Sequence, residues 1–256
     1  MAKDKTLVLI TGANQGLGFY AAQQLAATGE YHVLLGSRDF SKAEKAIQQL
    51  AADSSLKVNA QDLEPIQIDV TSDDSIKAAA KTVEDNHGKL DILMNNAGIA
   101  GAQAANADGT GPSLRELYRQ HYDTNVFGTA VVTDAFLPLL RKSTAPTGKR
   151  IAFTSSGLSS LEWALESPGI YSGATYPVYR STKTALNMIM VHYARLLEEE
   201  GFVVSGSDPG YCGTNLNGYG GVKHPREGAK VLIRAATDVK DKVHGRVVDE
   251  ENKEPW

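Results

Sequence analysis

Thr11-Gly12-Ala13-Asn14-Gln15-Gly16-Leu17-Gly18 is the stretch that decides the fold of this chain. A short apolar run of β type, residues 7–10, precedes it, and residues 19–27 follow with a helical pattern. A strand, a glycine-rich turn and a helix in this order form the context that a dinucleotide-binding fingerprint requires. Gly12 then allows a tight turn, Gly16 lets the backbone approach a pyrophosphate, and Gly18 lets the helix pack closely. The amino end of the helix would face the phosphates.

The composition is that of an ordinary globular protein. Hydrophobic residues make up 42% of the 256 and charged residues 22%, which suits a single α/β domain with a sizeable core. The net charge of −4 gives no sign of a nucleic-acid or membrane surface. Cys212 is the single cysteine, so an internal disulfide framework is excluded. No apolar run reaches membrane-spanning length and no signal-peptide pattern follows Met1, so we expect a cytoplasmic protein.

Strand-like and helix-like segments alternate along the whole chain. Further strands are predicted at 31–35, 65–68, 91–94, 150–153, 202–205 and 246–248, and helices at 41–51, 73–86, 113–141, 178–199 and 225–237. Repeated β-α-β order predicts a Rossmann-type, doubly wound parallel sheet of about seven strands, with helices on both faces. Ligands of such sheets bind beyond the carboxyl ends of the strands, where the candidate residues below are expected to lie.

Tyr179 and Lys183 are the first candidates for chemistry. They lie four residues apart within a predicted helix, so their side chains share one face. The same spacing recurs at Tyr219 and Lys223. That copy lies in a glycine-rich loop before Pro225, where no helix fixes the two side chains together, and we interpret it as chance.

The motifs together occur in an order typical of one family. The matching features are Thr-Gly-x-x-x-Gly-x-Gly at 11–18, Asp69 after the third strand, Asn-Asn-Ala-Gly at 95–98, Asn125, Ser156, the pair Tyr179 and Lys183, and Pro209-Gly210 after the sixth strand. In these features the chain resembles the short-chain dehydrogenase/reductases, and among them the carbonyl reductases. The resemblance covers most of the chain and implies an enzyme that transfers a hydride between a nicotinamide cofactor and a carbonyl or alcohol.

The resemblance implies a role for each catalytic candidate. Tyr179 would donate a proton to the carbonyl oxygen of the substrate. Lys183 would lower the pKa of Tyr179 from about 10 and would hydrogen-bond the nicotinamide ribose. Ser156 would hold the substrate oxygen, and Asn125 would hold a water that connects Lys183 with solvent. Ser155 is the alternative to Ser156, because adjacent residues at a strand end point to opposite sides. The family serine is usually the second of such a pair, so we expect Ser156.

The end of the second predicted strand indicates which nicotinamide cofactor binds. An acidic residue there favours NAD, whereas an arginine accommodates the 2′-phosphate of NADP. Here Ser37 stands in place of the carboxylate and Arg38 supplies a planar fork suited to phosphate. Asp39 is expected to face solvent or to start the next helix. The sequence therefore favours NADP(H).

The resemblance also implies a set of cofactor-binding residues. Asp69 would contact the adenine, Asn95 would line the cofactor cleft, and Thr214 would meet the carboxamide. The expected set is Gly12, Asn14, Gln15, Gly16, Leu17, Gly18, Arg38, Asp69, Val70, Asn96, Ala97, Gly98, Tyr179, Lys183, Pro209, Gly210 and Thr214.

The sequence favours an NADPH-dependent carbonyl reductase acting on a small-molecule aldehyde or ketone. The alternatives are a non-catalytic NADP(H)-binding redox sensor and an alcohol dehydrogenase that works mainly in the oxidative direction. No metal site is expected, because His87, His192 and His244 lack the spacing of metal ligands. The choice between a monomer and a homo-oligomer stays open, as does whether Trp256 docks on the body or on a neighbouring subunit.

Two segments are expected to wall the substrate pocket, within about 157–178 and 213–224. Both leave the cofactor core beside candidate site residues, and both combine glycines with apolar or aromatic side chains. The first segment makes the separation between Ser156 and Tyr179 longer than the family commonly shows. A solvated insertion without a role is the alternative for it.

Overall fold

Seven parallel strands form the central sheet of the computed structural model, which describes residues 5–102, 104, 110–250 and 254–256. Their order across the sheet is β3-β2-β1-β4-β5-β6-β7, and every neighbouring pair is parallel. The strands are β1 (Thr6–Ile10), β2 (Tyr31–Ser37), β3 (Leu63–Gln67), β4 (Ile92–Asn95), β5 (Arg150–Thr154), β6 (Val203–Ser207) and β7 (Val247–Val248). The strand order reverses on either side of β1, which confirms the predicted doubly wound sheet.

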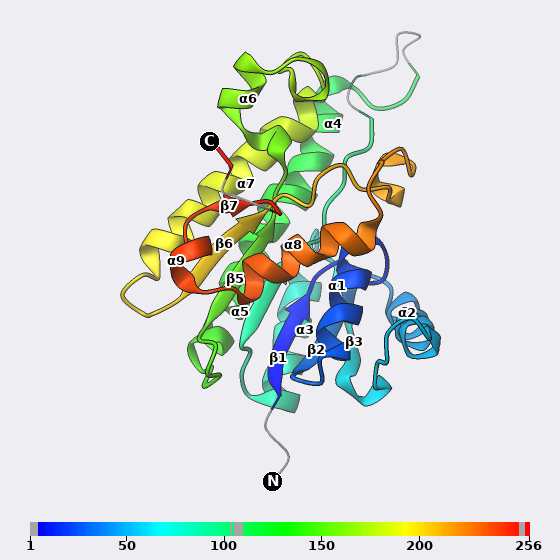
Figure 1. Cartoon of the computed structure of the whole chain (residues 1–256), viewed down its shortest axis with the longest axis vertical. Helices are drawn as coiled ribbons and strands as arrows, with labels where there is room; N and C mark the ends of the chain where they lie inside the picture. The colour runs from blue at the N-terminus through cyan, green and yellow to red at the C-terminus, as the bar shows by residue number, and fades with distance from the viewer. Residues whose placement is uncertain (1–4, 103, 105–109, 251–253) are drawn as a thin grey trace.

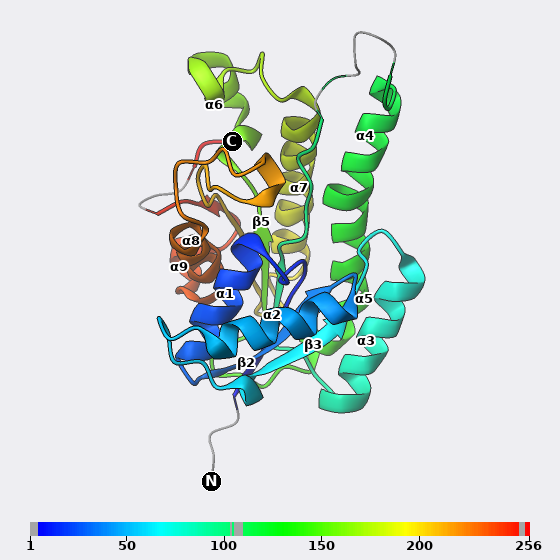
Figure 2. The ribbon, with the colours of Figure 1, turned by 90° about the vertical axis from the view of Figure 1, so that its right-hand side faces the viewer.

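Helices cover both faces of the sheet, as predicted (Figures 1 and 2). One face packs against α1 (Gly16–Ala27), α2 (Phe40–Ala52) and α8 (Pro225–Thr237). The other face packs against α3 (Asp73–His87), α5 (Thr129–Arg141) and α7 (Pro177–Leu196). Alternate residues of β1 serve the two faces: Val8 and Ile10 belong to the first core, and Leu9 to the second. This two-sided burial explains why the strands read as continuous apolar runs.

The predicted helix 113–141 is one helical region with an irregular centre. It comprises α4 (Leu114–Tyr122), a π-helical segment (Asp123–Gly128) and α5. A Cβ atom at Gly128 would lie 2.2 Å from the carbonyl oxygen of Val70, so the helix approaches the loop after β3 as closely as glycine permits. Pro138 lies within the last turns of α5.

The main differences from the predicted elements lie in the segment before α7. Residues 157–176, where the sequence predicted no helix or strand, contain a short helix, α6 (Leu161–Glu166), between two single 3₁₀ turns, Gly157–Ser159 and Gly169–Tyr171. A further short helix, α9 (Lys240–Val243), precedes β7, and a 3₁₀ turn at Asn215–Asn217 lies in the loop after β6. Periodicity does not reveal such short elements, because one or two turns contain too few apolar positions to repeat.

Pro65 lies in β3, the edge strand next to β2. An edge strand tolerates proline, because one of its sides needs no amide donor. All seven strands run the same way, so the loops that follow them gather at one end of the sheet. Among the described residues, no helix has the length and apolar character needed to cross a membrane.

Candidate active site

The glycine loop after β1 has the backbone that its sequence predicts. Gly12 and Gly16 have φ values of 63° and 61°, a region that residues with a Cβ atom rarely adopt. A Cβ atom at Gly18 would lie 2.5 Å from Nδ2 of Asn96, so this glycine allows α1 to pack against the loop. Gln15 at the N-cap of α1 makes no side-chain capping bond. The first amides of α1 are therefore available to an anion.

Thr11 and Asn96 join this loop to the end of β4. The backbone amides of Asn96 and Ala97 both donate to Oγ1 of Thr11 at 3.0 Å, and Nδ2 of Asn96 donates to the carbonyl oxygen of Thr11 at 2.8 Å. Asn95 does not line the cleft, contrary to the expectation for this residue. Its side chain is buried and donates to Oγ1 of Thr133 at 2.9 Å. The pleat of β4 sends adjacent side chains to opposite sides, so only Asn96 points to the loop.

A cleft of about 1210 Å³ runs along the carboxyl ends of the strands. Its lining includes every expected cofactor residue except Gly18, which lies beneath the loop: Gly12, Asn14, Gln15, Gly16, Leu17, Arg38, Asp69, Val70, Asn96, Ala97, Gly98, Tyr179, Lys183, Pro209, Gly210 and Thr214. The cleft also reaches Ser156. The structure therefore brings together residues that are far apart in the sequence, from the segments after β1 to β6 and from α7.

At the β2 end of the cleft two cations lie beside a helix terminus. Arg38 and Lys42 are exposed and line the cleft, and Lys42 lies in the first turn of α2. Lys42 was not among the residues that the sequence predicted, although its spacing from Arg38 is that of one helical turn. Asp39 caps α2, because its Oδ1 accepts hydrogen bonds from the amides of Ser41 and Lys42 at 3.0 and 3.4 Å. Its carboxylate thus starts the next helix, as expected.

The catalytic candidates meet near the end of β5. Tyr179 and Lys183 lie one turn apart on α7, and Nζ of Lys183 is 5.6 Å from the centre of the Tyr179 ring. The hydroxyl of Ser156 hydrogen-bonds the side chain of Tyr179. Ser155 points away from this pair: its hydroxyl donates to Oδ1 of Asn187 at 2.5 Å within the protein. Of the two adjacent serines, Ser156 is therefore the one beside the tyrosine.

Burial controls the ionisation of this site. Burial and then the charge of Asp208 raise the pKa of Tyr179 far above its ordinary value, and the hydrogen bond from Ser156 offsets part of this effect. Burial also lowers the pKa of Lys183 to about 8. The expected lowering of the tyrosine pKa by Lys183 is not what sets this pKa, because removing the phenolate from water costs more free energy than the hydrogen bond from Ser156 offsets. Tyr179 is thus a protonated phenol at neutral pH.

Asn125 lies in the π-helical segment, and its side chain bonds to the protein at both ends. Its Oδ1 accepts from the amide of Ile99 at 2.8 Å, and its Nδ2 donates to the carbonyl oxygen of Ile99 and to Oγ1 of Thr182. A Cβ atom at Gly98 would lie 3.2 Å from Oδ1 of Asn125 and 3.7 Å from Nζ of Lys183. Asn125 therefore lies close to Lys183 and ties the loop after β4 to α7.

The second tyrosine–lysine pair is not a site of this kind. Tyr219 is 73% exposed, and Nζ of Lys223 lies 3.0 Å from the carbonyl oxygen of Pro209 and 2.6 Å from Oε1 of Glu250. Cys212 is buried beside this loop, and burial raises the pKa of its thiol to about 11. A thiol with this pKa is a poor nucleophile, which agrees with its interpretation as pocket lining.

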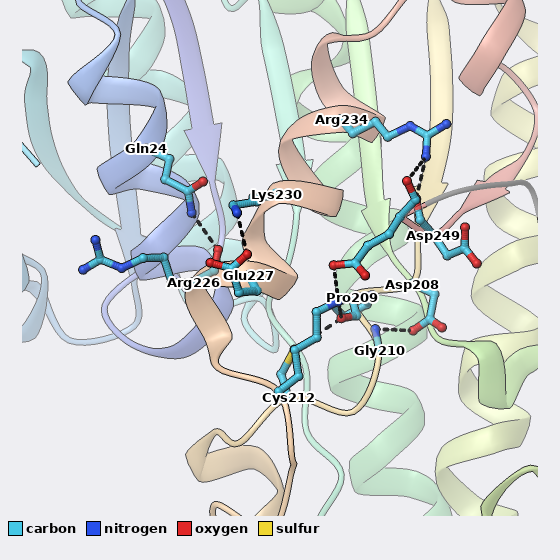
Figure 3. Close-up of polar contacts among 12 residues, drawn as sticks. Gln24, Asp208, Pro209, Gly210, Cys212, Arg226, Glu227, Lys230, Arg234 and Asp249 are labelled. Atoms are coloured by element: carbon cyan, nitrogen blue, oxygen red, sulfur yellow. Dashed lines mark hydrogen bonds and ion pairs between the residues drawn. The ribbon is translucent and has the colours of Figure 1, made fainter.

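Asp208 is a residue that sequence reasoning missed. It lines the cleft directly after β6, and Oδ1 accepts a hydrogen bond from the amide of Gly210 at 3.0 Å (Figure 3). Burial and the Asp208 carboxylate together raise the pKa of Glu254 to about 10. Glu254 comes from the end of the chain, so no local motif could reveal that these two carboxyl groups meet. Asp208 directly precedes the Pro209-Gly210 motif, and this position is the signal that could have drawn attention to it.

Part of each predicted substrate segment lines the cleft. The lining residues are Gly157, Leu158, Tyr171 and Tyr176 from the first segment and residues 214–218 and Val222 from the second. Leu165 is 88% exposed and lies outside the lining. Trp163 packs edge-on against Tyr171, with ring centres 5.2 Å apart, and so supports the wall from behind. The side chain of Ile170 is outside the described residues.

Arg180 anchors the first segment to α7 and was not singled out by the sequence. Its guanidinium donates to the carbonyl oxygens of Thr175, Leu158 and Ser172 at 2.8–3.0 Å. The carbonyl oxygen of Trp256 accepts from the amide of Glu162 at 3.0 Å, so the last residue docks on the body of the protein at the start of α6.

Comparisons with known proteins agree with this arrangement. The model of the short chain dehydrogenase family matches residues 6–221. The short-chain dehydrogenase anuI of Penicillium roqueforti is 48% identical over 254 residues, which cover 98% of this chain and 96% of that protein. The short-chain dehydrogenase/reductase tropE of Talaromyces stipitatus is 37% identical over 228 residues, covering 83% and 80%. The chain belongs to the short-chain dehydrogenase/reductase family of oxidoreductases.

Solved structures of similar fold include one animal reductase and one plant reductase. The NADPH-bound carbonyl reductase from chicken fatty liver is 26% identical, with a TM-score of 0.80, and the comparison covers 98% of this chain and 99% of that one. Salutaridine reductase from Papaver somniferum superimposes with a TM-score of 0.77 at 24% identity, covering 95% and 99%, and it shows the fold alone. The bound NADPH of the chicken enzyme is consistent with the NADP(H) cofactor that the sequence predicts.

Proposed function

We propose that this protein is an NADPH-dependent carbonyl reductase that reduces an aldehyde or a ketone, with Tyr179 as the proton donor. The observation that carries the proposal is the hydrogen-bonded pair of Ser156 and Tyr179 in the cleft, with Lys183 one helical turn away. The raised pKa of Tyr179 keeps its phenol protonated at neutral pH, which is the form that a general acid needs.

The cleft fits a nicotinamide dinucleotide phosphate. The amides at the start of α1 and the glycine loop would hold the pyrophosphate, and Arg38 with Lys42 would hold the 2′-phosphate. When bound, the nicotinamide supplies the hydride. The capping role of Asp39 supports NADP(H) over NAD(H), because its carboxylate already accepts three hydrogen bonds from Ser41 and Lys42.

The chain's own residues would handle the proton and the developing charge. Ser156 would donate to the carbonyl oxygen of the substrate and orient it toward Tyr179. Tyr179 would donate its proton to that oxygen as negative charge builds up there. Lys183 donates to the carbonyl oxygen of Thr154 at 2.7 Å, which holds its amine against the end of β5 and beside the tyrosine.

The test combines a substrate panel with one substitution. NADPH consumption would be measured with aldehydes, α-keto esters, diketones and aryl ketones. We expect turnover of at least one class, and Tyr179→Phe should lower it by about 10²–10⁴-fold while NADPH still binds. Tyr219→Phe is the matched control, because its ring is exposed outside the cleft lining, and it should keep nearly full activity.

The two alternatives make different forecasts in the same assay. A redox sensor would bind NADPH tightly without turnover of any substrate, and Tyr179→Phe would then change nothing. An oxidative enzyme would reduce NADP⁺ with an alcohol faster than it consumes NADPH with the matching ketone at neutral pH. If Tyr179→Phe kept more than half of the wild-type rate, the assignment of Tyr179 would be wrong.

A further inference from the structure

Two histidines and a glutamate meet at the end of the sheet opposite the cleft. His32 is the second residue of β2, Glu64 the second residue of β3, and His87 the last residue of α3. Nε2 of His32 and Nε2 of His87 lie 3.2 and 3.1 Å from the same oxygen, Oε2 of Glu64. One ligand atom from each of the three residues lies within 4.8 Å of the other two.

The parallel register of β2 and β3 explains why these side chains converge. Leu34 pairs with Glu64, and His32 lies two residues before Leu34, so all three side chains are on one face of the sheet. Leu34 belongs to the core that α3 covers, and the last turn of α3 brings His87 over the same corner. The three ligands come from separate segments, which is why their spacing in the sequence shows no metal motif.

The cluster stands apart from the proposed reaction. Ser37, at the carboxyl end of β2, lines the cleft, whereas His32 is near the start of the same strand. Five residues of extended strand separate them by roughly 16 Å. A function of the cluster is therefore independent of hydride transfer.

The donor set and its geometry suit a zinc ion. Imidazole nitrogen and carboxylate oxygen bind zinc at about 2.0–2.2 Å, so two ligands of a tetrahedral ion lie about 3.3 Å apart. The two distances to Glu64 are close to that edge. The imidazole rings of His32 and His87 are tilted by 47° with centres 5.6 Å apart, so they are not stacked on each other. Both nitrogens instead approach one carboxylate oxygen.

Exposure also suits a bound ion. The side chains of His32, Glu64 and His87 are 25%, 30% and 22% exposed, so an ion could enter from solvent while most of each ligand stays packed. We propose that His32, Glu64 and His87 bind one Zn²⁺ ion, with water in the fourth position. The ion would join β2, the edge strand β3 and the end of α3. This proposal departs from the expectation, based on spacing alone, that the chain has no metal site.

The test uses the full chain, stripped of metal by a chelator and free of any histidine tag. Titration with ZnCl₂ in a calorimeter should show one equivalent bound. His87→Gln should weaken this binding by more than about 100-fold, since loss of an outer partner alone costs 10–100-fold. His192→Gln is the matched control, because this histidine is exposed on α7, and it should bind zinc like the wild type.

Two further readouts separate a built site from stray binding. Co²⁺ should give the visible spectrum of a tetrahedral site with wild-type protein and not with His87→Gln. Zinc at a hundredfold excess over its dissociation constant should raise the melting temperature by about 5–10 °C in the wild type and in His192→Gln, and not in His87→Gln. If His87→Gln does not fold, Glu64→Gln provides the same comparison, with NADPH binding as the check on folding.

The proposal is overturned if the wild type binds no stoichiometric zinc. It is equally overturned if His87→Gln and Glu64→Gln both bind zinc like the wild type, or if NADPH displaces the ion. In those cases the cluster is a carboxylate that hydrogen-bonds two imidazoles without a metal. None of these results bears on the carbonyl reductase assignment, which rests on residues at the other end of the sheet.

Discussion

Lys183 donates a hydrogen bond to the carbonyl oxygen of Thr154 at 2.7 Å, and so ties α7 to the end of β5, two residues before Ser156. The contact fixes the amine within the protein, where only 4% of the residue is exposed. Burial disfavours the ammonium form and lowers the pKa of Lys183 to about 8. The lysine is thus charged at neutral pH but loses its charge at a mildly alkaline pH.

This pKa predicts a pH dependence of the reaction. Below about pH 8 the Lys183 ammonium would hydrogen-bond the nicotinamide ribose and stabilise negative charge that develops on Tyr179, and above that pH the loss of its charge would weaken both effects. We expect kcat/KM for NADPH, which reports the free enzyme, to fall above about pH 8. Lys183→Met should be nearly inactive throughout, whereas Lys45→Met, on the exposed side of α2, should keep the wild-type profile. A flat profile up to about pH 10 would contradict the prediction.

Arg38 is predicted to set the choice of cofactor. Arg38→Leu should raise KM for NADPH by up to roughly a hundredfold, because a charge-assisted contact with phosphate is lost, and should leave KM for NADH nearly unchanged. Lys42→Leu should act in the same direction, since Lys42 lines the same end of the cleft. Lys45→Leu removes a cation of the same helix outside the cleft and should change neither constant. Equal use of both cofactors by the wild type would refute this prediction.

The residues that line the substrate end of the cleft are predicted to set specificity. Tyr171→Ala and Leu216→Ala should change the ratio of activities on a bulky and a small ketone more than they change NADPH affinity. A lost methylene in such a pocket shifts preference by about 1–3 kcal/mol. Leu165→Ala is the control from the same inserted segment, because this side chain is 88% exposed. If Tyr171→Ala and Leu216→Ala both keep the wild-type preference, as the control does, the pocket lies elsewhere.

Glu254 predicts a pH dependence of stability. In the unfolded chain Glu254 ionises above its ordinary pKa, whereas in the fold burial and Asp208 raise the pKa to about 10. Between these two pKa values the folded state binds more protons than the unfolded state, so the free energy of unfolding falls as the pH rises. Gln stays neutral at every pH, so Glu254→Gln should be as stable as the wild type at about pH 4 and more stable at about pH 8. The difference between their free energies of unfolding should grow by at most about 1.4 kcal/mol per pH unit.

Urea unfolding of Glu254→Gln and of the wild type between about pH 4 and pH 8 would measure this difference in the free energy of unfolding. Glu162→Gln is a suitable control, because Glu162 is exposed on α6 and should give no growing difference. The prediction fails if Glu254→Gln and the wild type lose stability in parallel as the pH rises.

Local sequence determined the nucleotide loop and the alternation of strands and helices. Gly12 and Gly16 take a backbone conformation that other residues rarely adopt, and apolar runs mark the buried strands, so both signals are carried by a few adjacent residues. The spacing of Tyr179 and Lys183 on one helix face is local in the same sense. These features could be predicted because their physical cause acts within a few residues of chain.

Tertiary structure decided which of several similar residues face the cleft and what their surroundings do to them. Asn96 rather than Asn95 braces the glycine loop, and the raised pKa of Tyr179 comes from burial. The pairing of Asp208 with Glu254, like the meeting of the two histidines with Glu64, joins segments that are far apart in the sequence. Burial and long-range contacts exist only once the sheet has formed, so no local pattern in the sequence could report them.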